Sequence, residues 1–200
     1  MSTTRHEAVV ALAGGVGGAR LVDGLHRTLP RGALRVIANT GDDFAHWGLH
    51  ISPDLDTLMY TLAGLSPEDR GWGIAGDTFH VLDEARRRGL EDWFQLGDRD
   101  LITHLARTAA LARGETLTEV TRTLCHGLGV DPVILPMSDG PRPTTVVTPN
   151  GVELDFQEWL VRARAAPVVK ALRYGGDGRP SPQAVDALAI ADLIVICPSN

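Results

Sequence analysis

The chain begins with a strand, a glycine turn and a helix in direct succession. An apolar run from Ala8 to Ala13 leads into Gly-Gly-Val-Gly-Gly at positions 14–18, and apolar residues with helical spacing follow over 19–29. This order opens a nucleotide-binding α/β unit, because the turn lets backbone N–H groups approach phosphate oxygens. A second apolar run over 34–38 predicts the neighbouring strand, joined by a right-handed parallel crossover. We therefore expect an α/β fold with a Rossmann-like parallel sheet flanked by helices.

The middle of the chain predicts helices. Ser52-Pro53 combines an N-cap with proline at the first helical position and predicts a helix to Ala63. Three more helices are expected: one capped by Asp77 or Thr78 and ending at Arg88, one following Asp98 and ending at Arg113, and one from Thr118 to about Gly127. Because this block separates the first strands from the later ones, we expect a helical insertion over about 66–128.

The last third of the chain returns to strands. Asn150-Gly151 between two alternating segments is a strong signal for a small β-hairpin. The expected elements are a short buried strand (133–136), the hairpin strands (144–148 and 152–156), a further strand (168–172), a helix (181–190) and a buried strand ending at Cys197. We expect a single α/β domain over 1–200 that is truncated at its C-terminus relative to a longer natural polypeptide. The reason is that Pro198 begins a loop where α/β proteins place their next site turn.

Composition narrows the class of protein. The 200 residues carry a formal net charge of −6, with 44% hydrophobic and 22% charged residues, which is a soluble globular composition. A negative chain without a basic stripe argues against nucleic-acid binding. No apolar run approaches the roughly 20 residues that cross a bilayer, and the polar N-terminus lacks a signal-peptide core. Cys125 and Cys197 stand alone, so we expect a reducing, cytoplasmic environment.

Four carboxylates follow the second predicted strand on one short connection. Asp42 and Asp43 end the sequence Asn-Thr-Gly-Asp-Asp, and Asp54 and Asp56 lie at the start of the next predicted helix. At the carboxyl edge of a sheet, such acids meet a divalent cation, donors on a ligand, or basic side chains. The helix dipole accounts for Asp54, whereas Asp42 and Asp56 indicate metal or ligand contact. Oxygen ligands of this kind suit Mg²⁺ bound jointly with substrate phosphates.

The glycine turn matches neither standard phosphate-binding motif. Arg20 stands where a dinucleotide fold needs a small residue, and no Gly-Lys-Ser/Thr completes a P-loop. One interpretation is a tight turn without a ligand. Four glycines in five positions favour contact with phosphate or another ligand.

Other candidate residues leave their chemistry open. Arg99, between Asp98 and Asp100, is either a surface ion-pair residue or a clamp for an anionic or carbonyl-bearing ligand. His46 and His50 have no evident third metal ligand nearby. The four tryptophans serve core packing or form an aromatic wall for a planar ring.

Ordered motifs along the chain resemble the 2-phospho-L-lactate transferase family. They are Gly-Gly-Val-Gly-Gly-Ala-Arg (14–20), Asn-Thr-Gly-Asp-Asp (39–43), Ser-Pro-Asp-Leu-Asp-Thr (52–57), Trp-Gly-Ile (72–74), Leu-Gly-Asp-Arg-Asp (96–100), Ile134 to Asp139, Phe156-Gln157 and Pro198-Ser199-Asn200. The resemblance runs nearly end to end. Members of that family extend beyond this last motif, so we expect the missing part to complete the fold.

The resemblance implies a magnesium-dependent transfer in coenzyme F-420 biosynthesis. A phospholactyl or phosphoenolpyruvyl group would pass from a guanosine diphosphate-type donor to the ribityl hydroxyl of 7,8-didemethyl-8-hydroxy-5-deazariboflavin (Fo), releasing GMP. Asp42 would hold Mg²⁺ with Asp43 as a second or supporting ligand, and Asp56 and Arg99 would contact Fo. Asp56 would alternatively accept the attacking proton or share the metal, so Asp42 and Asp56 are the catalytic candidates. The further expected substrate-binding residues are Gly14, Gly15, Gly17, Gly18, Asn39, Thr40, Ser138, Ser199 and Asn200.

Alternatives to this reaction come from other classes. A related family, the gluconeogenesis-factor family of nucleotide-sugar-binding regulators, shares the glycine turn, but the motifs over 52–57 and 97–100 favour the transferase. A nicotinamide dehydrogenase is the weakest alternative, because the ribose-binding acid lacks its fingerprint context. The choice among lactate, enolpyruvate and glycerate on the donor leaves no motif. The family suggests a homodimer.

Overall fold

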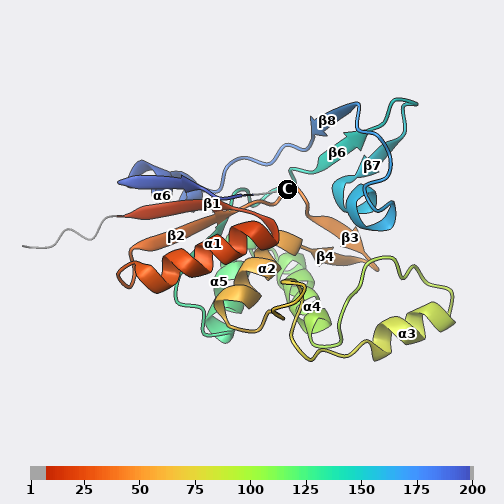
Figure 1. Ribbon diagram of the computed structural model, residues 1–200, viewed down its shortest axis with the longest axis horizontal. Helices are drawn as coiled ribbons and strands as arrows, with labels where there is room; N and C mark the ends of the chain where they lie inside the picture. Colours follow the sequence, from red (N-terminus) through yellow and green to blue (C-terminus); the bar gives the residue numbers. More distant parts are fainter. Residues whose placement is uncertain (1–7, 199–200) are drawn as a thin grey trace, which may run out of the picture.

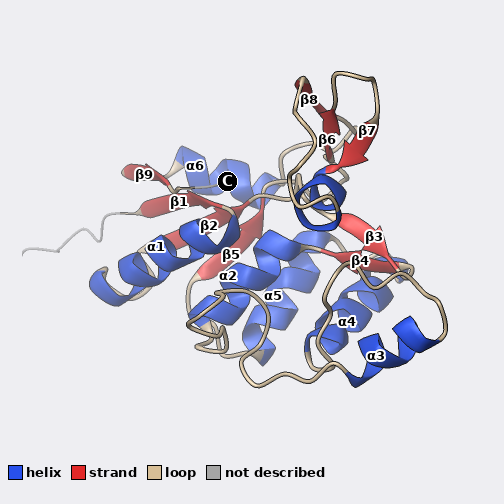
Figure 2. Ribbon diagram, turned by 45° about the vertical axis from the view of Figure 1, so that its right-hand side comes forward, coloured by secondary structure: helices blue, strands red, loops and turns tan. Residues whose placement is uncertain are grey.

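A four-stranded parallel sheet forms the centre of the protein. The computed structural model describes residues 8–198. The sheet has the order β5-β2-β1-β9, and each neighbouring pair is parallel. Its strands are β1 (Val9–Ala13), β2 (Leu34–Ala38), β5 (Val133–Pro136) and β9 (Leu193–Ile196). In Figure 1, β1 and β2 run side by side with α1 and α6 on opposite sides of them, and Figure 2 also labels β5 and β9.

Helices cover both faces of this sheet. One face carries α1 (Gly15–Thr28), α2 (Pro53–Leu62) and α5 (Leu117–Gly127), and the other carries α6 (Pro182–Ala189) (Figure 2). The alternation of side chains along β1 explains both layers. Val9 and Ala11 point to the α1–α2–α5 side, while Val10 packs with Ala184 and Ala187 of α6. The result is the Rossmann-like sheet flanked by helices that the sequence predicts.

The expected helical block divides between the core and the periphery. It contains α3 (His80–Arg87), α4 (Asp100–Ala112) and α5. Helix α5 supplies Leu117 and Cys125 to the main hydrophobic core, so it is part of the sheet-covering layer. Helix α4 packs against a hairpin that precedes α2, made of β3 (Phe44–His46) and β4 (Leu49–Ile51). Helix α3 lies farther out, at the end of a long loop.

A separate antiparallel sheet stands beside the hairpin of β3 and β4. It has the order β7-β6-β8, with β6 (Thr144–Val147), β7 (Glu153–Asp155) and β8 (Ala171–Tyr174). The β6–β7 pair confirms the predicted hairpin around Asn150-Gly151. The strand expected over 168–172 begins three residues later, at Ala171, and becomes the third strand of this sheet. A short π-helix (Glu158–Arg162) follows β7 and precedes β8.

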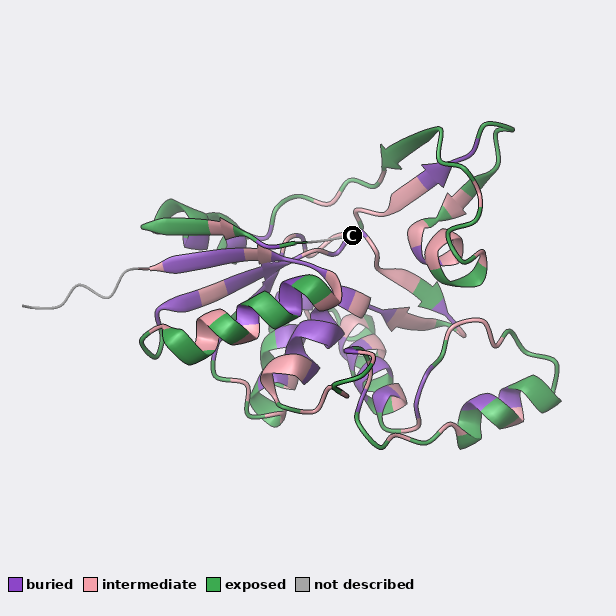
Figure 3. Ribbon diagram, in the orientation of Figure 1, coloured by how far each residue is buried: buried purple, intermediate pink, exposed green. Residues whose placement is uncertain are grey.

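One expectation about burial is wrong. The sequence predicts a buried last strand, but most of β9 is exposed, with Ile196 at 80% (Figure 3). Strand β9 pairs with β1 on one side, and within residues 8–198 nothing pairs with its other edge. Apolar composition therefore identified the strand but not its position in the sheet.

Among residues 8–198, no helix has both the length and the apolar character that a membrane crossing needs.

Candidate active site

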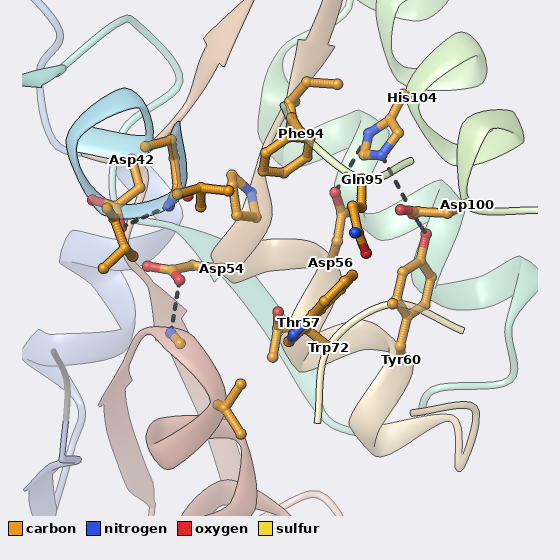
Figure 4. A pocket seen from close by; sticks show the side chains of 18 of the residues that line it. Asp42, Asp54, Asp56, Thr57, Tyr60, Trp72, Phe94, Gln95, Asp100 and His104 are labelled. Atoms are coloured by element: carbon orange, nitrogen blue, oxygen red, sulfur yellow. Dashed lines mark hydrogen bonds and ion pairs between the residues drawn. The ribbon is translucent and has the colours of Figure 1, made fainter. Parts of the chain in front are cut away.

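A cavity of about 530 Å³ lies where the chain leaves the carboxyl ends of β1 and β2. Parallel sheets bind ligands at this edge. The walls come from the start of α1, the loop after β2, helices α2 and α4, the loops around 72 and 94, and the π-helix region (Figure 4). The polar and aromatic lining residues include Asp42, Asp54, Asp56, Thr57, Tyr60, Trp72, Trp93, Phe94, Gln95, Asp100, His104 and Gln157. The structure places three of the four predicted acids, Asp42, Asp54 and Asp56, in this one cavity.

Asp54 joins the glycine turn to the loop after β2. Its Oδ1 accepts the backbone N–H of Gly15 (2.7 Å), and its Oδ2 accepts the Nδ2–H of Asn39 (2.8 Å). Gly14 allows this approach, because a Cβ there would lie 2.7 Å from Asp54 Oδ2. Asp54 lies in the first turn of α2, as predicted, but the helix dipole does not account for it alone. Its carboxylate bonds to the first helical N–H of α1 rather than to its own helix.

Asp42 lies in the cavity wall close to Asp54. Its Oδ2 accepts a long hydrogen bond from Gln157 Nε2 (3.5 Å). Burial is the main reason that its pKa is raised to about 7, and the negative charge of Asp54 adds to the effect. A partly buried acid beside another acid is stabilised in its charged form by a cation. The negative charges of Asp42 and Asp54 at this site therefore favour binding of a cation.

Asp43 does not border the cavity, and its carboxylate contacts two residues that precede α2. Its Oδ2 accepts from Ser52 Oγ (2.8 Å) and lies 3.0 Å from His50 Nε2. Its Oδ1 is buried and has no hydrogen-bond partner among the described residues. Burial raises the pKa of this carboxyl, and the His50 contact acts against that rise.

The donor set fits Mg²⁺ only if a substrate completes the coordination. Within residues 8–198, no three His, Cys, Asp or Glu side chains converge to hold a metal by themselves. Magnesium commonly uses one or two protein carboxylates together with substrate phosphates and water. Asp42 borders the cavity and makes one long hydrogen bond with Gln157, so its carboxylate is a hard oxygen donor of that type. Asp43 does not border the cavity, so in this arrangement its side chain does not add a second donor.

Asp56 lines the cavity and is paired with a buried arginine. Arg107 Nη1 donates to Asp56 Oδ2 (3.1 Å), and Arg107 Nη2 makes a close contact with Asp56 Oδ1. The Arg107 side chain is fully buried. Sequence reasoning missed Arg107, although a signal was present. The helix α4 residues Asp100, Thr103, His104 and Arg107 recur at helical spacing and form its buried face, so this helix turns polar side chains inward.

His104 connects that ion pair to a second group of polar side chains. Its Nδ1 lies 3.3 Å from Arg107 Nη1 and 3.6 Å from Asp56 Oδ2, and its Nε2 lies 3.3 Å from Asp100 Oδ1. The Tyr60 hydroxyl donates a hydrogen bond to Asp100 Oδ1 (2.7 Å). Burial, followed by the charges of Asp56 and Asp100, raises the pKa of Tyr60, so its hydroxyl keeps its proton. Figure 4 shows these side chains grouped on one wall of the cavity.

Aromatic rings form a further part of the lining. Trp72, Trp93 and Phe94 all border the cavity. Phe94 packs edge-on against Phe44 with ring centroids 4.9 Å apart, and Trp93 packs edge-on against His46 at 5.3 Å. Among the lining tryptophans, Trp72 is the more exposed, at 38%. The aromatic wall that the tryptophan content left open is present.

Four further predicted site residues do not border the cavity. Gly17 and Gly18 are in the first turn of α1 and face the backbone of Pro198. Thr40 is buried, with an unpartnered Oγ1. The hydroxyl of Ser138 donates to Gly140 O (2.9 Å). Neither Thr40 nor Ser138 borders the cavity.

Arg99 is also outside the lining. Its side chain is exposed and its Nη1 donates to Ala75 O (3.3 Å). Contact of Arg99 with Fo stays a prediction. Ser199 and Asn200 lie outside the described residues.

Comparison with known proteins identifies the family. Residues 9–200 match the family described as 2-phospho-L-lactate transferase CofD. The chain belongs to this family. It is 43% identical over 198 residues to the phosphoenolpyruvate transferase of Streptomyces avermitilis, and 41% identical over 194 residues to the 2-phospho-L-lactate transferase of Methanospirillum hungatei. The resemblance seen in the motifs is confirmed.

The alignments cover most of this chain but only part of each relative. They include 96% of this chain in both cases, and 62% and 65% of the respective relatives. Among solved structures, a Bacillus halodurans protein described as a member of the UPF0052 family has a TM-score of 0.62 at 17% identity, covering 96% of this chain and 59% of that one. At that identity the similarity shows the fold alone.

Proposed function

We propose that the protein is a transferase of coenzyme F-420 biosynthesis. It moves a phospholactyl or phosphoenolpyruvyl group from a guanosine diphosphate-type donor to the ribityl hydroxyl of Fo and releases GMP. One observation carries the proposal: a single cavity combines carboxylates beside a glycine turn with an aromatic wall, in a chain of this family. The relatives are named as transferases, which favours this function over the nucleotide-sugar-binding alternative.

The donor belongs at the end of the cavity formed by Asp42, Asp54 and the start of α1. Backbone N–H groups at a helix start attract phosphate oxygens, and Gly14 and Gly15 hold this turn close to the acids. Asp42 would hold Mg²⁺. Asp43, the next residue in the chain, would support Asp42 from outside the cavity. A bound Mg²⁺ would neutralise negative charge on the diphosphate of the donor.

The acceptor belongs at the aromatic end of the cavity. Trp72 and Phe94 offer faces or edges to a planar deazaflavin ring. Asp56 lies between this wall and the donor end, where a carboxylate orients a sugar-alcohol hydroxyl by accepting its hydrogen bond. Arg99 would reach Fo from the cavity rim. We further propose that the protein acts as a cytoplasmic homodimer, as its family resemblance suggests.

The chemical step requires positioning more than covalent help from the protein. The acceptor hydroxyl oxygen forms a bond to the phosphorus that carries the lactyl or enolpyruvyl group. The bond from that phosphorus to the GMP oxygen breaks, and the hydroxyl proton is lost to a base or water. Transfers of this kind depend mainly on alignment and on electrostatic stabilisation. The enclosed wall of fixed side chains around Asp56 and Asp42 is suited to both.

Product analysis tests the proposal directly. The protein is incubated with Fo, Mg²⁺ and, in separate reactions, guanosine diphosphate-type donors carrying lactate, enolpyruvate or glycerate. We expect one donor to yield GMP and a new Fo phosphodiester of the corresponding mass. Absence of product from all three donors, with Fo binding intact, would exclude this reaction.

A further inference from the structure

We infer that Arg107 is a positioning residue that holds the Asp56 carboxylate in one orientation toward the acceptor. The inference rests on the proposed function, since it assigns Asp56 to the acceptor end of the cavity. Arg107 itself does not line the cavity and would not touch substrate. Its Nη1 also donates to His50 O (3.4 Å), a residue that does not border the cavity, so toward the acceptor Arg107 would act through Asp56.

The contact has the geometry of a fixed support. Both terminal nitrogens of the Arg107 guanidinium face Asp56, one toward each carboxylate oxygen. A paired contact of this kind fixes the plane of the carboxylate as well as its position. Asp56 is 5% exposed and borders the cavity, so one side of a fixed carboxylate faces the ligand space.

Helix α4 buries this arginine while two apolar residues of the same helix are exposed. Ile102 and Leu105 on the same helix are 63% and 46% exposed, whereas Arg107 is fully buried. A buried ion pair is rarely more stabilising than apolar side chains of similar volume, because both charges lose their hydration. Burying Arg107 is therefore unfavourable for stability alone, and its pairing with Asp56 at the cavity accounts for its burial.

His104 fixes Arg107 from the side. A guanidinium only donates hydrogen bonds, so the contact of Arg107 Nη1 with His104 Nδ1 requires a lone pair on Nδ1. The ring proton then lies on Nε2, which is 3.3 Å from Asp100 Oδ1 without making a hydrogen bond to it. Asp100 accepts a hydrogen bond from Tyr60 of α2. The hydrogen-bonded support of Asp56 therefore extends to His104, and Asp100 and Tyr60 pack beside it.

A double-mutant cycle separates positioning from general stability. The variants are Asp56→Asn, Arg107→Lys and the two combined. The control is Arg113→Lys, which changes an exposed arginine at the end of the same helix, paired there with Glu115. Fo affinity is measured by deazaflavin fluorescence titration, folding by thermal denaturation, and transfer by kcat and the KM for Fo.

We expect Arg107→Lys to weaken Fo binding about tenfold, comparable with losing one hydrogen bond to a charged group, and Asp56→Asn to weaken it similarly. The combined variant should bind no more weakly than Asp56→Asn alone, because Arg107 acts through Asp56. The KM for Fo should rise more than kcat falls, and Arg113→Lys should behave as wild type.

Three results would overturn the inference. They are unchanged Fo affinity in Arg107→Lys, losses that multiply in the combined variant, and an equal loss in Arg113→Lys. If Arg107→Lys does not fold, Asp56→Asn is compared with Asp56→Asn/Arg107→Gln, in which neither side chain is charged. Equal Fo affinity of those two variants supports the inference, and a further loss contradicts it. A wild-type protein that binds no Fo would overturn the proposed function itself, and this inference with it.

Discussion

Asp77 and Asp98 cap each other's helix. Asp77, which precedes α3, accepts the backbone N–H groups of Arg99 (2.9 Å) and Asp100 (3.1 Å) at the start of α4. Asp98, which precedes α4, accepts the first two backbone N–H groups of α3, at 3.1 and 3.0 Å. The Gly-Asp-Arg-Asp motif is therefore part of a crossed capping arrangement that orients α4. Helix α4 carries Asp100 and His104 into the cavity wall.

Removing one side of this arrangement should weaken the fold. We expect Asp77→Ala to lower the free energy of unfolding by about 1 kcal/mol, as the loss of a helix cap does. Gly97→Ala should act on the same contact, because its Cβ would lie 2.2 Å from Asp77 Oδ2. Chemical denaturation of both single variants and the double variant should therefore show a combined loss smaller than the sum. Additive losses would contradict the shared contact. Gly127→Ala, whose Cβ meets open space, serves as the control.

A methyl group at Gly14 should disturb the donor end of the cavity. The Cβ of Gly14→Ala would lie 2.7 Å from Asp54 Oδ2 and 3.3 Å from Asn39 Cβ, so the Asp54 carboxylate must move off Gly15. We expect the KM for the guanosine donor to rise at least about tenfold, as expected for losing a charge-assisted hydrogen bond. The matched control is Gly24→Ala in the exposed middle of α1, which should keep activity and gain up to about 1 kcal/mol of stability. Unchanged donor kinetics in Gly14→Ala would contradict the assignment.

Asp42→Asn should abolish transfer while leaving Fo binding and folding intact. The neutral amide loses the charge that would hold Mg²⁺, and removing a preorganised electrostatic group commonly lowers kcat by about 100-fold or more. Product formation and Fo fluorescence are measured on the same preparation. Asp23→Asn, an acid of the α1 surface paired with Arg27, is the control. Normal turnover in Asp42→Asn would rule out its role at the metal.

The stability difference between Asp42→Asn and wild type should depend on pH. The folded pKa of Asp42 is raised from 3.8 to about 7 by burial and by Asp54. Between those values the folded protein binds a proton that the unfolded chain has lost, so wild-type stability falls as the pH rises from about 4 to about 7. Without divalent cations, Asp42→Asn should therefore be the more stable protein at pH 8, by a margin of up to about 4 kcal/mol, and lose this margin near pH 4. Added Mg²⁺ should reduce the margin. A pH-independent difference in melting temperature would contradict the shift.

Arg99→Ala tests the contact that the family resemblance implies. Because its exposed side chain donates to the Ala75 carbonyl alone among the described residues, we expect little change in thermal stability. Fo affinity should fall about tenfold if the guanidinium contacts the deazaflavin. Arg88→Ala, an exposed arginine paired with Glu84 on α3, provides the comparison. Equal fluorescence titrations for the two variants would exclude Arg99 from the Fo site.

The sequence by itself determined the layers of the protein. Segments 34–38 and 133–136 are strands with the bounds that their apolar runs predict. Strand β2 lies inside the sheet, and β5 lies at its edge but is still mostly buried, so both read as largely apolar segments. Ser52-Pro53 likewise marked the start of α2, since proline is preorganised for a first helical turn. The order of the motifs was enough to identify the family.

Only the tertiary structure decided which partners the charged side chains contact. The bond between Asp54 and Gly15 joins residues 39 positions apart, and the Asp56–Arg107 pair joins residues 51 positions apart. Local patterns describe propensity and periodicity within an element, whereas these contacts depend on how separate helices meet over the sheet. For the same reason Asp77 caps α4 and Asp98 caps α3. Each carboxylate bonds to the first N–H groups of a helix about 20 residues away in the chain, which folding brings within reach.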